Sequence, residues 1–371
     1  MAANQDIVFV QIPVLRAFMK DVLLTLGVCA ADAETVSEVL SEADARGIPS
    51  HGVARFKGFY ADPIRQGIIN PKAIPTIVRD VQATAVVDGN FGLGHPIGRF
   101  AMDLAIKKAK KFGLGFVTVR NSNHYGIAGW YASRALANNM IGITGTNARP
   151  SVAPTNSVEP MFGTNPIAFA MPVDDEFPFV FDAATTIAQR GKVETYARLG
   201  KTLPDGWVIG EDGQCKTEPA SILSELTKGK AALLPIGGIF EETGSHKGFG
   251  FATIVEILSS VLQQGAFLQQ LSGMQNGKRV PNCIGHFFAA VNMECFGDVE
   301  EMKKHAGELL KTLRAAKRRT PEQEIFTAGI KELRTAQRSE HQGVPVDSEV
   351  IAEILSLKKD FSLSQYQFPF E

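Results

Sequence analysis

The sequence of 371 residues has few cysteines, and their placement argues against two classes of protein. No two of the four cysteines form a CxxC pair, and no Cys/His cluster has the spacing of zinc ligands. Isolated cysteines are typical of free thiols in a reducing compartment rather than of a disulfide framework. We therefore expect no bound metal and no disulfides. The cysteines are Cys29, Cys215, Cys283 and Cys295.

The chain also lacks a large excess of charge of either sign, and its formal net charge is −1. A nearly neutral chain argues against nucleic acid or an anionic membrane as the main partner. The basic pair Arg318-Arg319 lies in a segment with interspersed acids, which favours a solvated face over a nucleic-acid patch. The longest apolar runs contain charges or glycine and are shorter than the ~20 residues of a membrane span. Without a secretory pattern at the N-terminus, we expect a cytosolic protein.

Helical and strand-like segments alternate along the chain, which indicates a layered α/β or α+β fold. Two helices are predicted within residues 13–46, where Gly47 and Pro49 end the second. The tail, residues 314–342, is predicted to be a solvated helix or an arm. The other predicted helices span 100–111, 128–138, 250–263 and 299–317, and the predicted strands span 83–88, 115–120, 141–146, 167–171, 179–182, 233–236 and 286–292.

A glycine-rich stretch, residues 89–98, is a near miss for a dinucleotide-binding loop. Gly92, Gly94 and Gly98 give G-x-G-x-x-x-G, and no acidic residue follows at the distance that a ribose contact requires. The pattern favours a tight strand-to-helix turn over a Rossmann domain.

The segment Ser50–Phe56 carries the residue types that a 2-oxo acid reductase needs. The planar fork of Arg55 can bind a carboxylate with two hydrogen bonds. The imidazole of His51 can exchange a proton near neutral pH. The two residues are four positions apart and would share one face if the segment were helical. Spacing alone also fits a surface or structural role.

Three further clusters are candidates for the same site. His124 follows a predicted strand, where ligand sites gather in α/β folds, although its polar neighbours also fit a capping loop. Asp182 closes an apolar strand and is a possible partner for a histidine. Lys247 and Gly248 open an apolar helix, whose N-terminus suits a phosphate.

Taken together, these motifs resemble the malate/L-lactate dehydrogenase family of the second type, which includes sulfolactate and ureidoglycolate dehydrogenases. The resemblance covers roughly residues 10–350. The segments that carry it are Ser50–Phe56, Asn121–Gly126, Met161–Pro166, Phe181–Thr186, Leu203–Trp207 and Lys247–Gly250.

The resemblance implies a fold that is not Rossmann: a mixed α/β (α+β) protein in which a mixed sheet binds the cofactor. A second, helical or α+β domain would form from both chain ends, residues 1–122 and 300–371, with residues 123–299 as the cofactor domain. It also implies a homodimer, NAD or NADP as cofactor, and a small 2-oxo or 2-hydroxy acid as substrate.

The resemblance also implies roles for individual residues. His51 matches the proton donor, supported by Asp182 and Ser50, while His124 matches a proton acceptor of some members and a possible substrate contact. Arg55 matches the carboxylate ligand, and Thr164 is expected to line the pocket. The expected cofactor contacts are Asn147, Ala148, Asp182, Ala183, Ala184, Lys247, Gly248 and Gly329. At the last of these the family often has Pro-Gly-Glu, whereas this chain has Ala-Gly-Ile.

Malate and oxaloacetate are the first expected substrate pair, followed by another 2-oxo acid, such as pyruvate, or a cyclic imine acid. An alternative interpretation is that the protein is a catalytically silent dimeric relative of these enzymes. This is disfavoured because the sequence keeps Ser50, His51, Arg55 and Asp182. A Ser-His-Asp hydrolase is also disfavoured, because Ser50 and His51 are adjacent and no Gly-x-Ser-x-Gly elbow occurs.

Overall fold

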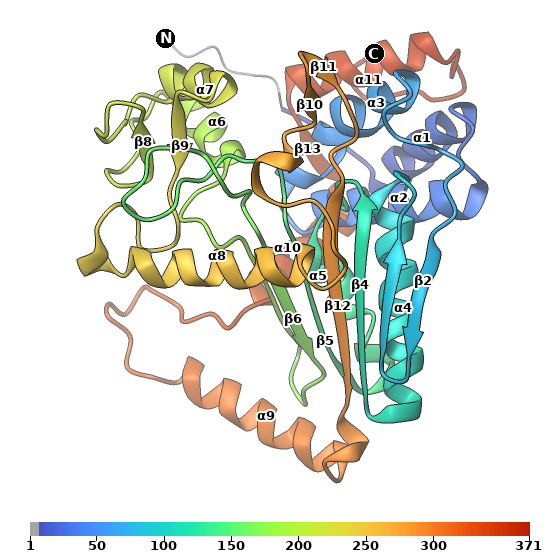
Figure 1. Ribbon diagram of the computed structural model, residues 1–371, viewed down its shortest axis with the longest axis vertical. Helices are drawn as coiled ribbons and strands as arrows, with labels where there is room; N and C mark the ends of the chain where they lie inside the picture. The colour runs from blue at the N-terminus through green and yellow to red at the C-terminus, as the bar shows by residue number, and fades with distance from the viewer. Residues whose placement is uncertain (1–6) are drawn as a thin grey trace.

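A computed structural model describes residues 7–371 and places a mixed seven-stranded sheet at the centre of the protein (Figure 1). Only β3 and β4 are parallel neighbours, and every other pair in this sheet is antiparallel. The expected mixed, non-Rossmann sheet is therefore confirmed. In spatial order its strands are β2 (Thr76–Val81), β3 (Thr84–Asp88), β4 (Leu114–Ser122), β12 (Ile284–Asn292), β5 (Met140–Thr146), β6 (Ile167–Met171) and β7 (Phe179–Ala183).

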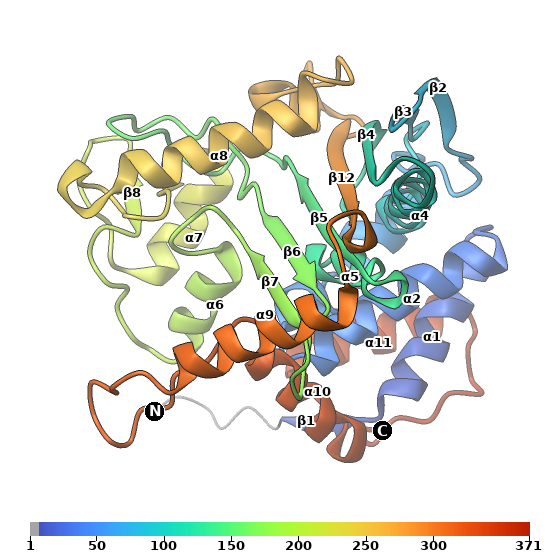
Figure 2. The ribbon, with the colours of Figure 1, turned by 90° about the horizontal axis from the view of Figure 1, so that it is seen from below.

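Helices cover both faces of this sheet (Figures 1 and 2). Helices α4 (Gly94–Phe112) and α5 (Ala128–Ser133) pack on one face, where Phe288 and Tyr131 belong to a buried apolar cluster. Helix α8 (Ser245–Ser260) crosses the opposite face over β12, β5 and β4. Since strands buried on both faces have few solvent positions, β12 is apolar along nearly all its length, as its sequence indicated.

The two ends of the chain pack together beside the sheet. Strand β1 (Val8–Val10) pairs antiparallel with β13 (Val344–Val346). Around them α1 (Ile12–Thr25), α2 (Ala30–Ala45) and α11 (Ser348–Asp360) share one apolar cluster, and α10 (Ile330–Gln342) contacts α2. The central sheet contains strands from both sides of the boundary expected between residues 122 and 123, because β4 pairs with β12. The division into two domains stays a prediction.

A smaller unit stands next to the sheet on the side of β7 (Figure 2). It consists of α6 (Arg190–Arg198), α7 (Pro219–Lys228), β8 (Val208–Gly210) and β9 (Ala231–Leu233) around their own apolar cluster. The strand expected over 233–236 instead ends at Leu233. The remaining elements are α3 (Asp62–Arg65), β10 (Met274–Gln275), β11 (Lys278–Arg279) and α9 (Val299–Arg314).

The glycine-rich stretch is a tight turn between β3 and α4, as predicted. A Cβ atom at Gly94 would lie 2.1 Å from the carbonyl oxygen of Asn123, and one at Gly89 would lie 2.9 Å from that of Asn121. Both glycines are needed for close backbone packing, and this packing brings the end of β4 next to the start of α4.

Candidate active site

The segment with His51 and Arg55 is not the α-helix considered from the sequence. It forms two 3-10 turns, Pro49–His51 and Val53–Arg55, interrupted at Gly52. The cause is the buried carboxylate of Asp44, which accepts the Val53 N–H at 2.8 Å and fills the space beside Gly52. A Cβ atom at Gly52 would lie 1.9 Å from this carboxylate. The condition for a shared α-helical face is therefore not met, and Asp44 fixes the turn instead.

The turn brings His51 against His124, which follows β4. Their rings stack with centroids 5.5 Å apart and an angle of 27° between the planes. The Nδ1 atom of His51 lies 3.0 Å from the Ser50 hydroxyl. Two histidines that are distant in the sequence thus form one cluster, which we call the histidine pair.

The ring of His124 is held by Tyr60, a fully buried residue of the π-helical turn Lys57–Ala61. The Tyr60 hydroxyl is hydrogen-bonded to Nδ1 of His124. Because the Gly126 N–H donates to the same atom at 3.3 Å, Nδ1 is an acceptor and the Tyr60 hydroxyl is its second donor. Burial raises the pKa of Tyr60 far above its ordinary value, so that its hydroxyl keeps the proton. An Nδ1 atom that accepts from two donors requires a neutral ring whose proton is on Nε2.

Burial keeps both members of the histidine pair neutral near pH 7. It lowers the pKa of His51 to about 4, with a further contribution from the positive charge of Arg55. The pKa of His124 is lowered well below its ordinary value, mainly by burial and then by the nearby His51. The site therefore presents imidazoles, not imidazolium ions, before a substrate binds.

Arg55 is anchored at one end and open at the other. Its Nε–H donates to the Ser50 carbonyl oxygen at 2.8 Å, and its guanidinium carbon lies 5.4 Å from the centroid of Phe59. Among residues 7–371, its Nη2 atom has only a long contact of 3.5 Å, with the carboxylate of Glu194 on α6. The fork of Arg55 is therefore positioned beside the histidine pair, with its terminal nitrogens available to an anion.

Asp182 is found at the edge strand β7, where its carboxylate accepts the Gly129 N–H at 2.7 Å. It thus caps the start of α5, and within residues 7–371 no hydrogen bond joins it to His51. Crowding by protein atoms raises the pKa of Asp182 to about 6. The residue as a whole is exposed at the sheet edge. Its role as the orienting acid of His51 stays a prediction.

The expected cofactor loops meet at α8 through a buried carboxylate, Glu256. Its oxygens accept from the side chains of Asn147 at 3.4 Å and Asn165 at 2.8 Å, and from the Leu268 N–H at 3.0 Å. Burial raises the pKa of Glu256. Asn147 also accepts the Gly285 N–H at 2.8 Å, so its amide fixes the loop rather than facing open space.

The residues after β7 lie next to the start of α8. Thr185 donates its N–H to the Thr164 carbonyl oxygen at 3.0 Å and accepts the Ile236 N–H at 3.0 Å. A Cβ atom at Gly248 would lie 2.1 Å from the Ile236 carbonyl oxygen, which shows how closely the helix packs on this segment. The contacts bring the segments of Thr164, of residues 182–184 and of Gly248 into one region.

The remaining cofactor candidates differ in what surrounds them. Lys247 is exposed on the first turn of α8, where a cation beside the positive end of the helix dipole fits an anionic ligand such as a diphosphate. Ala148 packs against Gly163, where a Cβ atom would lie 2.5 Å away. Gly329 has a φ of +96°, a conformation that favours glycine, and it packs on Val180 of β7. These two features explain a requirement for glycine at this position without a cofactor.

Sequence reasoning missed four residues that shape the site: Asp44, Tyr60, Glu194 and Glu256. Glu256 is the single acid of the apolar helix α8, and this unusual placement was the available signal. Asp44 gave no such signal, because α2 carries several other acids. Tyr60 and Glu194 carry no such signal, because their partners lie far away in the sequence.

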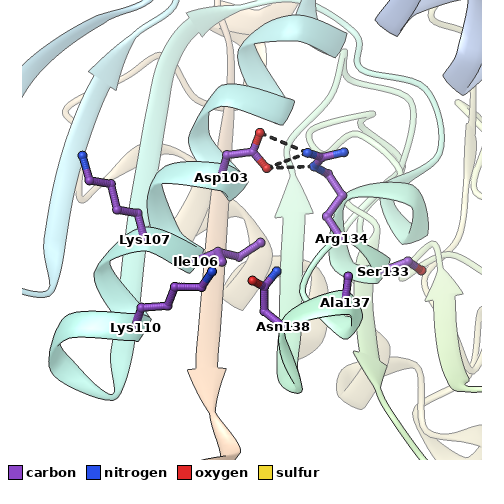
Figure 3. A pocket seen from close by; sticks show the side chains of 8 residues that line it. All are labelled: Asp103, Ile106, Lys107, Lys110, Ser133, Arg134, Ala137 and Asn138. Carbon is purple, nitrogen blue, oxygen red and sulfur yellow. Dashed lines mark hydrogen bonds and ion pairs between the residues drawn. The ribbon is translucent and has the colours of Figure 1, made fainter.

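A surface hollow between α4 and α5 is a separate feature (Figure 3). It is lined by Lys107, Lys110 and other polar side chains, and its Arg134 is paired with Asp103 at 2.8 Å. None of the candidate site residues lines it. Its composition of solvated surface charges does not suggest the chemistry of the histidine pair.

Within residues 7–371, no helix combines the length and the apolar composition that crossing a bilayer requires.

Comparison with known proteins gives a consistent result over almost the whole chain. The family model described as malate/L-lactate dehydrogenase matches residues 10–355. A malate dehydrogenase of Pyrococcus horikoshii is 39% identical over 93% of both chains. An L-sulfolactate dehydrogenase of Methanocaldococcus jannaschii is 36% identical over 93% of this chain and 94% of its own.

Solved structures agree. The crystal structure of malate dehydrogenase from Entamoeba histolytica superposes with a TM-score of 0.93 at 42% identity, over 98% of this chain and 100% of that one. The fold, the motifs and these relatives together show that the chain belongs to the malate/L-lactate dehydrogenase family and is a 2-hydroxyacid dehydrogenase.

Proposed function

We propose that the protein catalyses reversible hydride transfer between a nicotinamide cofactor, NAD or NADP, and C2 of a small 2-oxo or 2-hydroxy acid, with oxaloacetate and malate as the first pair. The observation that carries this proposal is the histidine pair beside the open fork of Arg55. Malate dehydrogenases at 39% and 41% identity support the choice of substrate. The nicotinamide, when bound, supplies or accepts the hydride.

His51 is the acid and base in this proposal. The Ser50 hydroxyl can accept a hydrogen bond from Nδ1, which leaves Nε2 with a lone pair for the substrate hydroxyl. In the oxidation of a hydroxy acid, the neutral ring takes this proton as the hydride leaves. In reduction, the protonated ring returns it to the carbonyl oxygen. Ser50 positions the ring, and Asp182 is the acid that supports it in this proposal.

His124 has a different task, because its Nδ1 already accepts from Tyr60 and Gly126. Its Nε2–H is a fixed donor that can polarise the substrate carbonyl and stabilise negative charge on the oxygen. We therefore assign proton transfer to His51 and oxygen stabilisation to His124.

Arg55 binds the carboxylate next to the reacting carbon, and the region of Thr164 forms the wall of the same pocket. A carboxylate held by two hydrogen bonds fixes the orientation of C2 toward the nicotinamide. Lys247 and the N-terminus of α8 hold the cofactor phosphates in this proposal, with Asn147, Ala148 and Asp182–Ala184 along the cofactor and Gly329 at its outer edge.

The direct test is the oxidation of NADH and of NADPH, each with oxaloacetate, pyruvate and a cyclic imine acid. We expect turnover with oxaloacetate and at least one of the two cofactors. If no member of the panel oxidises either cofactor, the proposal is wrong and the catalytically silent alternative gains support.

We propose further that the protein is a homodimer, supported by the outer face of α8. Phe251, Ile254 and Ile257, followed by Val261, are each between 45% and 60% exposed on one side of the helix. A continuous apolar row of this kind is typical of an interface. Light scattering should give twice the chain mass, and Phe251→Glu should lower it. A monomer at micromolar concentration would contradict this proposal.

A further inference from the structure

Glu194 joins two arginines in the substrate region. One carboxylate oxygen lies 3.5 Å from Nη2 of Arg55, and the other lies 3.1 Å from Nε of Arg190. A Cβ atom at Gly191 would lie 3.8 Å from Nη2 of Arg55 and 3.0 Å from the Cβ of Ser50, so the first turn of α6 rests directly on the catalytic turn. Arg190 is thus a second guanidinium one carboxylate away from the first.

The charge around Arg190 is not balanced. Burial, followed by the positive charges of Arg190 and Arg279, lowers the pKa of Arg149 in the loop after β5. Within residues 7–371, Arg149 makes no ion pair, and Arg279 bonds only the amide of Gln66 at 3.2 Å. Within the part of the chain that the structure describes, Arg190 therefore pairs with one carboxylate, which it shares with Arg55, and lies near the further positive charges of Arg149 and Arg279. Such a group of positive charges attracts further negative charge.

We propose that Arg190 is a specificity-determining residue that binds the second anionic group of a dianionic 2-oxo acid, while Arg55 binds its C1 carboxylate. Glu194 occupies the space between the two guanidiniums before the substrate arrives, and the substrate displaces it. This inference rests on the function proposed above and names its substrate class: acids with a carboxylate or sulfonate at the far end.

Two features of Glu194 fit this displacement. Its contact with Arg55 is at the long limit of an ion pair, and its side chain is 31% exposed, so the bond is weak and the side chain can turn away. Arg190 is also secured independently, because its Nη1 donates to the Thr227 hydroxyl at 3.1 Å. It therefore keeps its place when Glu194 leaves.

The test compares oxaloacetate with 2-oxobutyrate, which has a neutral methyl group at the far end. In Arg190→Gln we expect kcat/KM for oxaloacetate to fall about 10- to 100-fold, which is the scale of a lost charge-assisted hydrogen bond, and that for 2-oxobutyrate to change less than about threefold. Sulfopyruvate forms a third arm, which separates a carboxylate preference from a general preference for anions. An equal fall for all substrates, or no fall, would overturn the proposal.

Two further variants sharpen this result. Glu194→Gln removes the competing carboxylate, so that KM for oxaloacetate should decrease. Arg198→Gln is the matched control, because Arg198 lies on the same helix but pairs with Asp347 at 3.0 Å, away from Arg55. It should leave both substrates unchanged. A Glu194→Gln variant with a higher KM for oxaloacetate would contradict the displacement.

A binding measurement separates this inference from the proposed function. Calorimetric titration with succinate and with butyrate requires no turnover, and we expect the wild type, but not Arg190→Gln, to prefer succinate. If the wild type reduces no 2-oxo acid but still prefers succinate in this way, the function is wrong and the binding site stands. If the wild type binds succinate no more tightly than butyrate, the proposed second anion site at Arg190 is wrong, whatever the activity.

Discussion

The two histidines of the pair have similar surroundings but different hydrogen bonds, and the difference decides what each can do. Both are half-buried, and desolvation by the surrounding protein lowers the pKa of each. His51 has one partner on Nδ1, a serine hydroxyl that can either donate or accept. His124 has two partners on Nδ1, and both are donors. Only the first arrangement lets a ring gain and lose a proton without breaking a hydrogen bond.

The largest expected effect is the loss of His51. His51→Ala should lower kcat by about 10² to 10⁴, the usual contribution of a general acid or base. His124→Ala removes an oxygen-stabilising donor and should lower kcat by about 10² to 10³. Steady-state rates with oxaloacetate measure both. Small amine or imidazole bases added to the solution should rescue His51→Ala and not His124→Ala, and rescue in the opposite pattern would reverse the two roles.

The pH dependence of the reaction distinguishes His51 from a histidine with an ordinary pKa. Oxidation of malate needs neutral His51, and a ring with a pKa of about 4 is still neutral at pH 5. The value of kcat/KM should therefore stay nearly flat from pH 8 to pH 5, whereas a pKa of 6.5 would reduce it about thirtyfold at pH 5. Reduction needs the protonated ring and should become slower as the pH rises. A midpoint near 6.5 for oxidation would contradict the assigned environment of His51.

Arg55→Lys should have a smaller effect, confined to substrate binding. Lysine keeps the charge but loses the planar fork and the Nε bond to Ser50, so that KM for oxaloacetate should rise about tenfold while kcat changes little. A loss in kcat with an unchanged KM would show that Arg55 acts on the transition state instead.

Tyr60→Phe should have the smallest effect, about threefold in kcat. It removes one of the two donors to Nδ1 of His124 and leaves the Gly126 N–H in place. Because the tautomer is then fixed by one bond instead of two, the pH range of activity should narrow on the acid side. A profile identical to that of the wild type would show that Gly126 alone fixes the ring.

The sequence indicated a layered α/β or α+β fold and most of its strands, because alternation and apolar runs depend on local residues. The mixed, non-Rossmann sheet was implied by the resemblance to the family and not by these patterns. His51, Arg55 and His124 were identified as site residues, but their arrangement was not predicted. The turn at Gly52 depends on Asp44, and the tautomer of His124 depends on Tyr60, which is far from it in the sequence. Contacts of this kind follow from the packing of distant segments, so that no local pattern reveals them. For the same reason the sequence left the proton role shared between the two histidines.

The most direct test of the assignment is the ¹⁵N NMR spectrum of the histidine rings, assigned with His51→Ala and His124→Ala. At pH 7 we expect His124 to carry its proton on Nε2 and His51 to carry its proton on Nδ1. When an unreactive substrate analogue binds, only the protonation state of His51 should change. A His124 ring that is protonated on Nδ1, or that titrates on binding while His51 does not, would contradict the account.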